Sequence, residues 1–217
     1  MDLIGVLDIA GKTDTGRVRS QNEDSIGESA ALGTIVLADG MGGYQSGEVA
    51  SALAVNTILN FLHEKLPELD PGTVNADTGY SEESIIARAC IKLANDAIFK
   101  AANSKKEDHG MGTTIVLGMV HDNRMTIAHV GDSRMYRVRD SVLELLTVDH
   151  TLLQELVDRG FYSQQEAEAT LSKNLVTRAL GIENSVAVDI TDVDVLPGDI
   201  YMCCSDGLND MIDDEDI

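Results

Sequence analysis

Three short apolar runs in this chain each end on an aspartate at a turn that contains glycine. The aspartates are Asp39, Asp132 and Asp206. A carboxylate directly after a buried strand is unfavourable unless an opposite charge pairs with it. A further acidic pair, Glu23 and Asp24, lies near the start of the chain. The pattern therefore predicts a fold in which acidic strand ends converge on a cation.

Two long segments carry apolar side chains at the three- to four-residue spacing of amphipathic helices. The first begins after Ser46, which is the predicted N-cap, and its apolar stripe includes Val49. The second extends from about Ser81 to Lys105, and its stripe includes Leu93. We therefore expect two long helices, each with one buried face.

Short β-rich runs make up most of the remaining chain. They cover residues 34–40, 113–120, 125–130, 135–138, 142–147, 186–193 and 200–205. Because most of these runs follow one another instead of alternating with helices, the pattern predicts an α+β fold with antiparallel sheets covered by helices. Residues 148–183 interrupt the strands with two short helix-like segments and are predicted to form a flap within a single domain spanning residues 1–217.

The formal net charge of −21 argues against nucleic-acid binding, because phosphate backbones are bound by clustered lysine and arginine. No apolar run reaches the roughly 20 residues that span a bilayer, and the first residues do not have the pattern of a secretory signal. These features predict a cytoplasmic protein without membrane insertion. Cys90, Cys203 and Cys204 are expected to pack in the interior without disulfides.

The acidic residues at the strand ends offer only oxygen atoms to a cation. The predicted ligands are Glu23, Asp24, Asp39, Asp132, Asp206 and the carbonyl of Gly40. Hard divalent ions such as Mg²⁺ and Mn²⁺ prefer oxygen ligands, whereas a zinc site would need histidine or cysteine at a recognisable spacing. Any single aspartate of this kind is explained as well by a turn or cap. The set as a whole indicates a metal site.

Five segments of the chain occur in the order typical of metal-dependent Ser/Thr protein phosphatases. They are GRVRSQNED at 16–24, ADGMGG at 38–43, GMGTT at 110–114, VGDSR at 130–134 and SDGLND at 205–210. From about Thr13 to its last residue the chain thus resembles the bacterial branch of the protein phosphatase 2C family. The resemblance implies a four-layer α-β-β-α sandwich, in which two central antiparallel sheets are flanked by helices. That architecture agrees with the fold class expected from the strand and helix pattern.

The resemblance also implies roles for individual residues. Asp39 would bridge two Mg²⁺ or Mn²⁺ ions, the Gly40 carbonyl would bind beside it, and Asp206 would hold one ion. Glu23 and Asp24 would lie around the pair, partly through water. A further assignment concerns a third ion, which the resemblance places at Asp132.

Arg19 matches the family's phosphate-binding arginine, which would make it a catalytic residue together with Asp39 and Asp206. Its planar guanidinium suits paired hydrogen bonds to phosphate oxygens. Arg17 is the rival for this role, and for either arginine a solvated or ion-paired surface role is the alternative.

Taken together, the resemblance implies a hydrolase that removes phosphate from phosphoserine and phosphothreonine by attack of a metal-bridging water. The expected partners are phosphorylated proteins and a cognate Ser/Thr kinase that the phosphatase opposes in signalling.

Two departures from the family pattern limit this interpretation. Met41 stands where eukaryotic relatives have a histidine proposed as a general acid, and a thioether cannot donate a proton. His150 is a candidate substitute, although a structural role is the more ordinary interpretation of a single histidine.

The family's last helix and strand, which carry a metal-ligand aspartate, are absent from this sequence. A shortened phosphatase, or a regulatory binding module with weak or no turnover, is therefore the alternative. An aspartyl-nucleophile phosphatase is not supported, since Asp39-Gly-Met lacks the required Asp-x-Asp.

Overall fold

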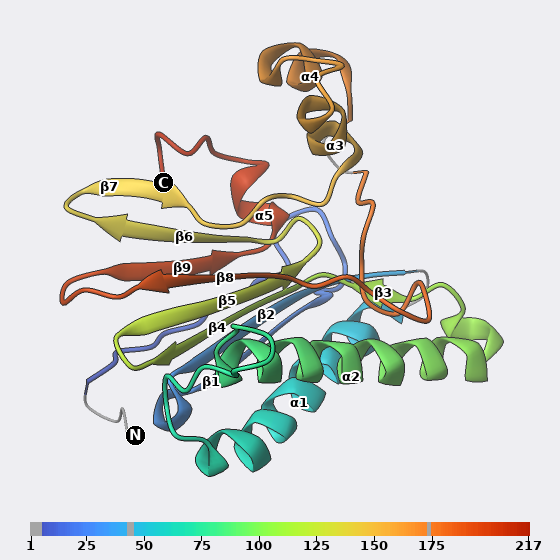
Figure 1. Ribbon diagram of the computed structural model, residues 1–217. Coiled ribbons are helices and arrows are strands. Elements are labelled where there is room, and N and C mark those ends of the chain that lie inside the picture. The colour runs from blue at the N-terminus through green and yellow to red at the C-terminus, as the bar shows by residue number, and fades with distance from the viewer. Residues whose placement is uncertain (1–5, 43–45, 173–174) are drawn as a thin grey trace.

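The computed structural model describes residues 6–42, 46–172 and 175–217. Its larger sheet is antiparallel and has the strand order β1-β2-β4-β5-β8, with the short β3 paired to the end of β2 (Figure 1). The strands are β1 (Asp24–Ser29), β2 (Thr34–Met41), β3 (Gly112–Thr113), β4 (Ile115–His121), β5 (Arg124–Val130) and β8 (Asp189–Asp194).

A second antiparallel sheet lies on one face of the first. It contains β7 (Val142–Leu145), β6 (Arg134–Arg139) and β9 (Ile200–Cys204), in that order. Apolar side chains fill the space between the two sheets, including the buried Val116, Met125, Ile127 and Met135. The chain crosses from one sheet to the other at residues 131–133, directly after β5.

Two long helices, α1 (Ser46–Lys65) and α2 (Glu82–Ser104), cover the opposite face of the larger sheet (Figure 1). Many of their buried residues are small, including Ala50, Ala54, Ala87 and Ala94, which lets helix and sheet backbones approach closely. Ser81 caps α2, because its hydroxyl accepts the Ser84 N–H. Short 3₁₀ turns cover Ala30–Leu32, Leu66–Glu68 and Lys106–Asp108.

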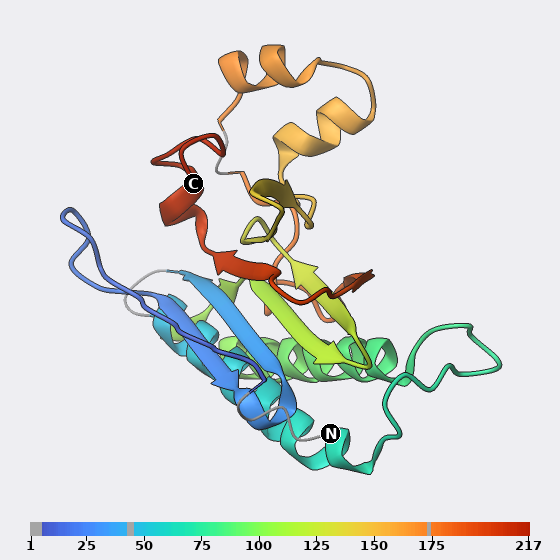
Figure 2. The same ribbon diagram turned by 90° about the vertical axis from the view of Figure 1, so that its left-hand side faces the viewer.

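The segment predicted as a flap projects away from both sheets (Figures 1 and 2). It contains α3 (Leu152–Asp158) and α4 (Gln164–Thr170), which are capped by the hydroxyls of Thr151 and Ser163. A last short helix, α5 (Asp206–Asn209), follows β9 directly. These three helices lie on the side of the second sheet, opposite α1 and α2. Residues 173–174 of the flap, and Gly43 of the glycine-rich motif, lie outside the described residues.

The expected α+β class, with two antiparallel sheets and flanking helices, is confirmed. One strand was not predicted: β1 reads DSIGES, which has little apolar character, and it forms because β2 pairs with it along its whole length. Cys90, Cys203 and Cys204 are all free, as expected. Among the helices that the structure describes, none has the length and apolar character needed to cross a bilayer.

Three local predictions are corrected. Ser46 was predicted as the N-cap that precedes the first long helix, but it is the first residue of α1. Its buried hydroxyl donates to the Glu107 carbonyl (3.2 Å). Val49 and Leu93, expected on the apolar stripes, are exposed at the edges of their helices. Periodicity alone places these residues near a buried face, but the width of the face in contact is set by the sheet beneath it.

Candidate metal centre

The acidic strand ends predicted from the sequence come together at one edge of the sheets. Asp24, at the start of β1, pairs in register with Asp39 near the end of β2. Asp132 lies in the crossing that follows β5, and Asp206 is the first residue of α5 after β9. Residues far apart in the chain thereby approach one another because antiparallel pairing brings their strand ends to the same side.

Threonines of the 110–114 motif hold the backbone of Asp39 in place. The Asp39 N–H donates to Thr114 Oγ1 (3.0 Å), and the Asp39 carbonyl accepts from the Thr114 N–H (2.8 Å) and the Thr113 hydroxyl (2.8 Å). Thr114 Oγ1 is also hydrogen-bonded to Ser133 Oγ (2.7 Å). These contacts connect the end of β2 to the crossing that carries Asp132.

Gly40 and Gly47 pack against each other without room for side chains. A Cβ at Gly40 would lie 2.1 Å from the Gly47 carbonyl oxygen, and one at Gly47 would lie 2.5 Å from Glu23 Oε1. The Gly40 N–H donates to the Glu23 carbonyl (3.0 Å). The Glu23 carboxylate therefore lies against the first turn of α1, while its backbone carbonyl holds Gly40. Gly40 continues strand β2 after Asp39 and does not form the predicted turn.

Asp24 connects the two sheets at this edge. Its Oδ2 accepts from the Ser205 hydroxyl (2.9 Å), and its N–H donates to Asn22 Oδ1 (3.1 Å). Ser205 directly precedes Asp206, so the same contact places the end of β9 beside the start of β1.

The carboxylates at this edge repel one another. Burial, followed by the charges of Asp24, Asp206 and Asp132, raises the pKa of Asp39 to about 8. Burial and the charge of Asp206 raise the pKa of Asp132 to about 6. The pKa of Asp206 is raised by burial and by the charge of Asp210. Buried and half-buried carboxylates with raised pKa values and only oxygen donors fit a hard divalent cation, because its charge would offset both the repulsion and the desolvation.

Two further carboxylates belong to this edge and were not predicted as site residues. Asp210 raises the pKa of both Asp206 and Asp132, and Asp149 raises that of Asp132. Asp210 could have been found from its spacing, since it lies four residues after Asp206. Nothing in the sequence around Asp149 connects it to the cluster, because the flap and the crossing meet only in the folded chain.

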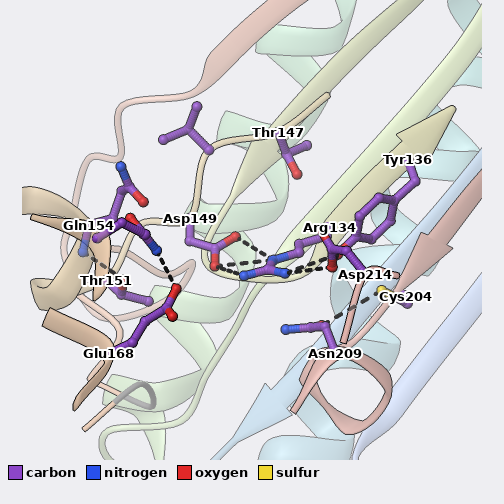
Figure 3. Close-up of polar contacts among 12 residues, drawn as sticks. Arg134, Tyr136, Thr147, Asp149, Thr151, Gln154, Glu168, Cys204, Asn209 and Asp214 are labelled. Atoms are coloured by element: carbon purple, nitrogen blue, oxygen red, sulfur yellow. Dashed lines mark hydrogen bonds and ion pairs between the residues drawn. The ribbon is translucent and has the colours of Figure 1, made fainter. Parts of the chain in front are cut away.

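Asp149 is held by Arg134, as Figure 3 shows. Arg134 Nε lies 3.0 Å from Asp149 Oδ1, and Nη2 lies 2.7 Å from Oδ2. Arg134 Nη1 donates to the Tyr136 hydroxyl (2.9 Å), which in turn donates to Asp214 Oδ1 (2.9 Å). This arginine is already engaged by carboxylates, which makes it a poor phosphate ligand.

A cavity of about 490 Å³ is lined by residues of the acidic edge and of the flap. Several of its lining residues, among them Asp149, Thr151 and Glu168, are drawn in Figure 3. Asp132 and Asp206 line one side, and flap residues line the other, among them Thr151, Leu153, Gln154, Gln164 and Glu168. A group that enters this cavity therefore meets the candidate metal ligands on one side and the flap on the other.

The structure separates the two candidate arginines. Both are exposed, and the charge of Arg19 opposes the rise in the pKa of Asp206, which places Arg19 beside the acidic cluster. Met41, which takes the place of the family's proton-donating histidine, is the last residue of β2. The candidate substitute, His150, is buried at 6% exposure, and both of its ring nitrogens lie close to polar partners.

The raised pKa values predict how the metal-free protein responds to pH. Folded Asp39 has a pKa of about 8, above the roughly 3.9 of an unfolded aspartate, so between these values the folded state keeps a proton that the unfolded state has lost. The stabilisation from that proton is complete below pH 4 and is lost as the pH rises toward 8. Urea unfolding in EDTA should show a falling free energy of unfolding, by at most about 1.4 kcal/mol per pH unit for one such group.

Added Mn²⁺ should reverse this loss at pH 7.5. Equal free energies of unfolding at pH 5.5 and pH 7.5 in EDTA would contradict the electrostatic account of the cluster.

The fold and the site together define a class: an α+β sandwich with an oxygen-only centre suited to divalent metals. A comparison of the chain with known families then assigns it within that class. The family model described as Protein phosphatase 2C matches residues 16–217. The chain belongs to the protein phosphatase 2C family.

Relatives in bacteria agree with this assignment. The serine/threonine protein phosphatase PstP of Mycobacterium tuberculosis is 36% identical over 214 residues, covering 98% of this chain and 38% of PstP. The serine/threonine phosphatase stp of Listeria monocytogenes is 36% identical over 204 residues, covering 93% of this chain and 77% of stp. A crystal structure of the PstP catalytic domain with two manganese ions has a TM-score of 0.78 at 35% identity, covering 94% of this chain and 80% of that one. The chain thus spans 38% of the length of the mycobacterial relative.

Proposed function

We propose that this chain is a Mg²⁺- or Mn²⁺-dependent protein phosphatase that hydrolyses phosphoserine and phosphothreonine. The observation that carries the proposal is the convergence of the buried Asp132 with the half-buried Asp24, Asp39 and Asp206, which raises the pKa of Asp39 to about 8. The relatives named serine/threonine phosphatases, one of them solved with two manganese ions, support the same reading.

Each residue at the acidic edge has a part in this proposal. Asp39 would hold both metal ions, the Gly40 carbonyl would bind beside it, Asp206 would hold one ion, and Glu23 and Asp24 would lie around the pair, partly through water. For a third ion the proposed ligand is Asp132. When bound, the ions supply Lewis acidity, offset charge on the phosphoryl group and lower the pKa of the attacking water.

The protein's own side chains supply orientation. Arg19 binds the phosphate oxygens, and Thr113 and Thr114 keep the Asp39 backbone fixed through their hydrogen bonds. The cavity beside Asp132 and Asp206 receives the phosphorylated segment of the substrate. Its flap wall contacts the neighbouring residues of that segment and thereby contributes to substrate choice.

We further propose phosphorylated cytoplasmic proteins as substrates, with a Ser/Thr kinase as the antagonist. The test of the activity is phosphate release from a phosphothreonine peptide with Mn²⁺, with Mg²⁺ and with EDTA. Release that requires either metal is expected. Tight metal binding without release would instead favour a regulatory binding module, and release in EDTA would contradict a metal-dependent mechanism.

Replacing Arg19 by alanine should mainly weaken substrate binding. A lost charge-assisted hydrogen bond to phosphate is worth about 1.5–3 kcal/mol, so we expect Arg19→Ala to raise KM for a phosphopeptide by roughly 10- to 100-fold, with a smaller effect on kcat. Steady-state kinetics at saturating Mn²⁺ measure both constants. Arg17→Ala is the matched control and should leave KM within about threefold. A larger KM change in the Arg17 variant would transfer the phosphate role to that residue.

A further inference from the structure

The turn that carries Asp132 is held from the flap side by one histidine. The His150 N–H donates to the Gly131 carbonyl (3.0 Å), and the Gly131 N–H donates to His150 Nδ1 (3.0 Å). Gly131 has a φ of 109°, a conformation that favours glycine, and a Cβ there would lie 2.6 Å from Thr114 Cγ2. His150 therefore binds both polar groups of the residue immediately before Asp132.

These contacts determine which ring nitrogen carries the proton. Because Nδ1 of His150 accepts the Gly131 N–H, the proton of the neutral ring lies on Nε2. Nε2 lies 3.2 Å from Asp189 Oδ2 and donates to it, while Arg178 Nη1 donates to Asp189 Oδ1 (2.7 Å). Arg178 and the His150 ring thus share one carboxylate as their acceptor.

A second histidine keeps the ring from rotating. The rings of His129 and His150 stack with centroids 4.7 Å apart and an angle of 15° between their planes. His129 Nε2 is hydrogen-bonded to the Val148 carbonyl (2.8 Å). The His150 ring is thereby held on one face by His129 and at its outer nitrogen by Asp189.

The same residues do not make a convincing second metal site. His129, His150 and Asp189 have potential ligand atoms within 4.8 Å of one another. Arg178 Nη1, however, lies 3.0 Å from His150 Nε2 and 2.7 Å from Asp189, so a guanidinium already occupies the place of a cation. The cluster is better explained by orientation than by metal binding.

We infer that His150 is a positioning residue for Asp132: by accepting the Gly131 N–H at Nδ1, it orients the peptide that aims the Asp132 carboxylate at its metal ion. This inference rests on the proposed function, in which Asp132 is a metal ligand. It also accounts for the burial of His150, which a proton donor to the leaving group would not need. Partners that orient metal ligands typically change metal affinity by about 10- to 100-fold when removed.

Two substitutions separate the two ring nitrogens. In His150→Asn the side-chain amide reaches the position of Nδ1, so an acceptor for the Gly131 N–H remains while the contact with Asp189 is lost. In His150→Gln the amide reaches the position of Nε2, so the contact with Asp189 remains while the acceptor for Gly131 is lost. Both variants lose the buried ring and its stacking on His129, so a general loss of packing affects them alike.

Mn²⁺ titration followed by electron paramagnetic resonance of the free ion measures the binding. We expect His150→Gln to lower the Mn²⁺ affinity of one binding site by about 10- to 100-fold, and Asp132→Asn should lower the affinity of the same site. His150→Asn should stay within about threefold of the unmodified protein. Equal weakening in the Asn and Gln variants, or none in either, would overturn the inference. If Asp132→Asn itself leaves every Mn²⁺ class unchanged, Asp132 is not a ligand and the inference fails with that assignment.

The proposed function is tested separately, because its failure would appear as absent phosphate release from the unmodified protein at saturating Mn²⁺. If a variant does not fold, nitrogen NMR of the unmodified protein provides the test, because it reports which ring nitrogen of His150 carries the proton. We expect the His150 ring to be protonated at Nε2 and unprotonated at Nδ1, with slow exchange of the Gly131 amide proton. A ring protonated at Nδ1 would contradict the inference without any variant.

Discussion

Asp39→Asn is expected to abolish metal-dependent phosphate release while making the metal-free protein more stable at pH 7.5. The substitution removes the central carboxylate of the proposed metal pair, and a loss of about 4 kcal/mol of transition-state stabilisation corresponds to roughly 10³-fold in rate. It also removes a half-buried carboxyl group whose ionisation Asp24, Asp206 and Asp132 oppose, whereas the unfolded chain ionises it freely. We expect the free energy of unfolding in EDTA to rise by about 1–3 kcal/mol.

Phosphopeptide hydrolysis with Mn²⁺ and urea unfolding in EDTA measure these two effects on the same variant. The matched control is Asp77→Asn, an exposed aspartate in the loop before α2, which should change neither quantity by a measurable amount. An active Asp39→Asn variant would contradict the proposed metal bridge. A variant that is inactive but less stable than the unmodified protein in EDTA would contradict the electrostatic strain that we infer at this site.

Gly40→Ala is expected to damage both the fold and the site. The added Cβ would lie 2.1 Å from the Gly47 carbonyl oxygen and 2.6 Å from the Glu23 carbonyl oxygen, and both obstacles are backbone atoms that cannot rotate away. Relief requires the end of β2 to move away from α1, which shifts Asp39. We expect a loss of about 2–4 kcal/mol in the free energy of unfolding and little or no remaining hydrolysis.

The second Asp-Gly pair supplies the control for this substitution. In Gly207→Ala the new Cβ would have Ser205 Oγ at 3.9 Å as its nearest neighbour, and the residue lies within helix α5. We expect the free energy of unfolding of this variant to stay within about 0.5 kcal/mol of that of the unmodified protein, since alanine has a higher helix propensity than glycine. Thermal melts and Mn²⁺-dependent hydrolysis compare the two variants. Equal tolerance of both would mean that Gly40 is not confined as tightly as the packing indicates.

Local chemistry made part of this site predictable. Asp39, Asp132 and Asp206 stood out because a charged residue directly after an apolar strand is unusual in any fold. The two long helices were predictable because their apolar spacing persists over many turns. Strand β1 was not predictable, because its own sequence has little β-forming character and it becomes a strand by pairing with β2.

The flap's contribution to the site depended on tertiary structure throughout. Asp149 reaches the cluster only because Arg134 holds it beside the crossing after β5. His150 accepts the Gly131 N–H, although the two residues lie 19 positions apart in the sequence. Neither contact has a spacing rule that could reveal it, since a loop can join the same two elements in many ways.

The sequence alone determined the kind of chemistry that this protein can perform, because oxygen-only side chains at strand ends admit a hard cation whatever the details of the fold. Only the tertiary structure decided how strongly the carboxylates interact, that the charge of Arg19 acts on Asp206, and that His150 accepts the N–H of the residue before Asp132. The physical reason is that residue type sets which atoms can bind, whereas burial and distance set the energies, and both of these arise only when the two sheets and the flap pack together.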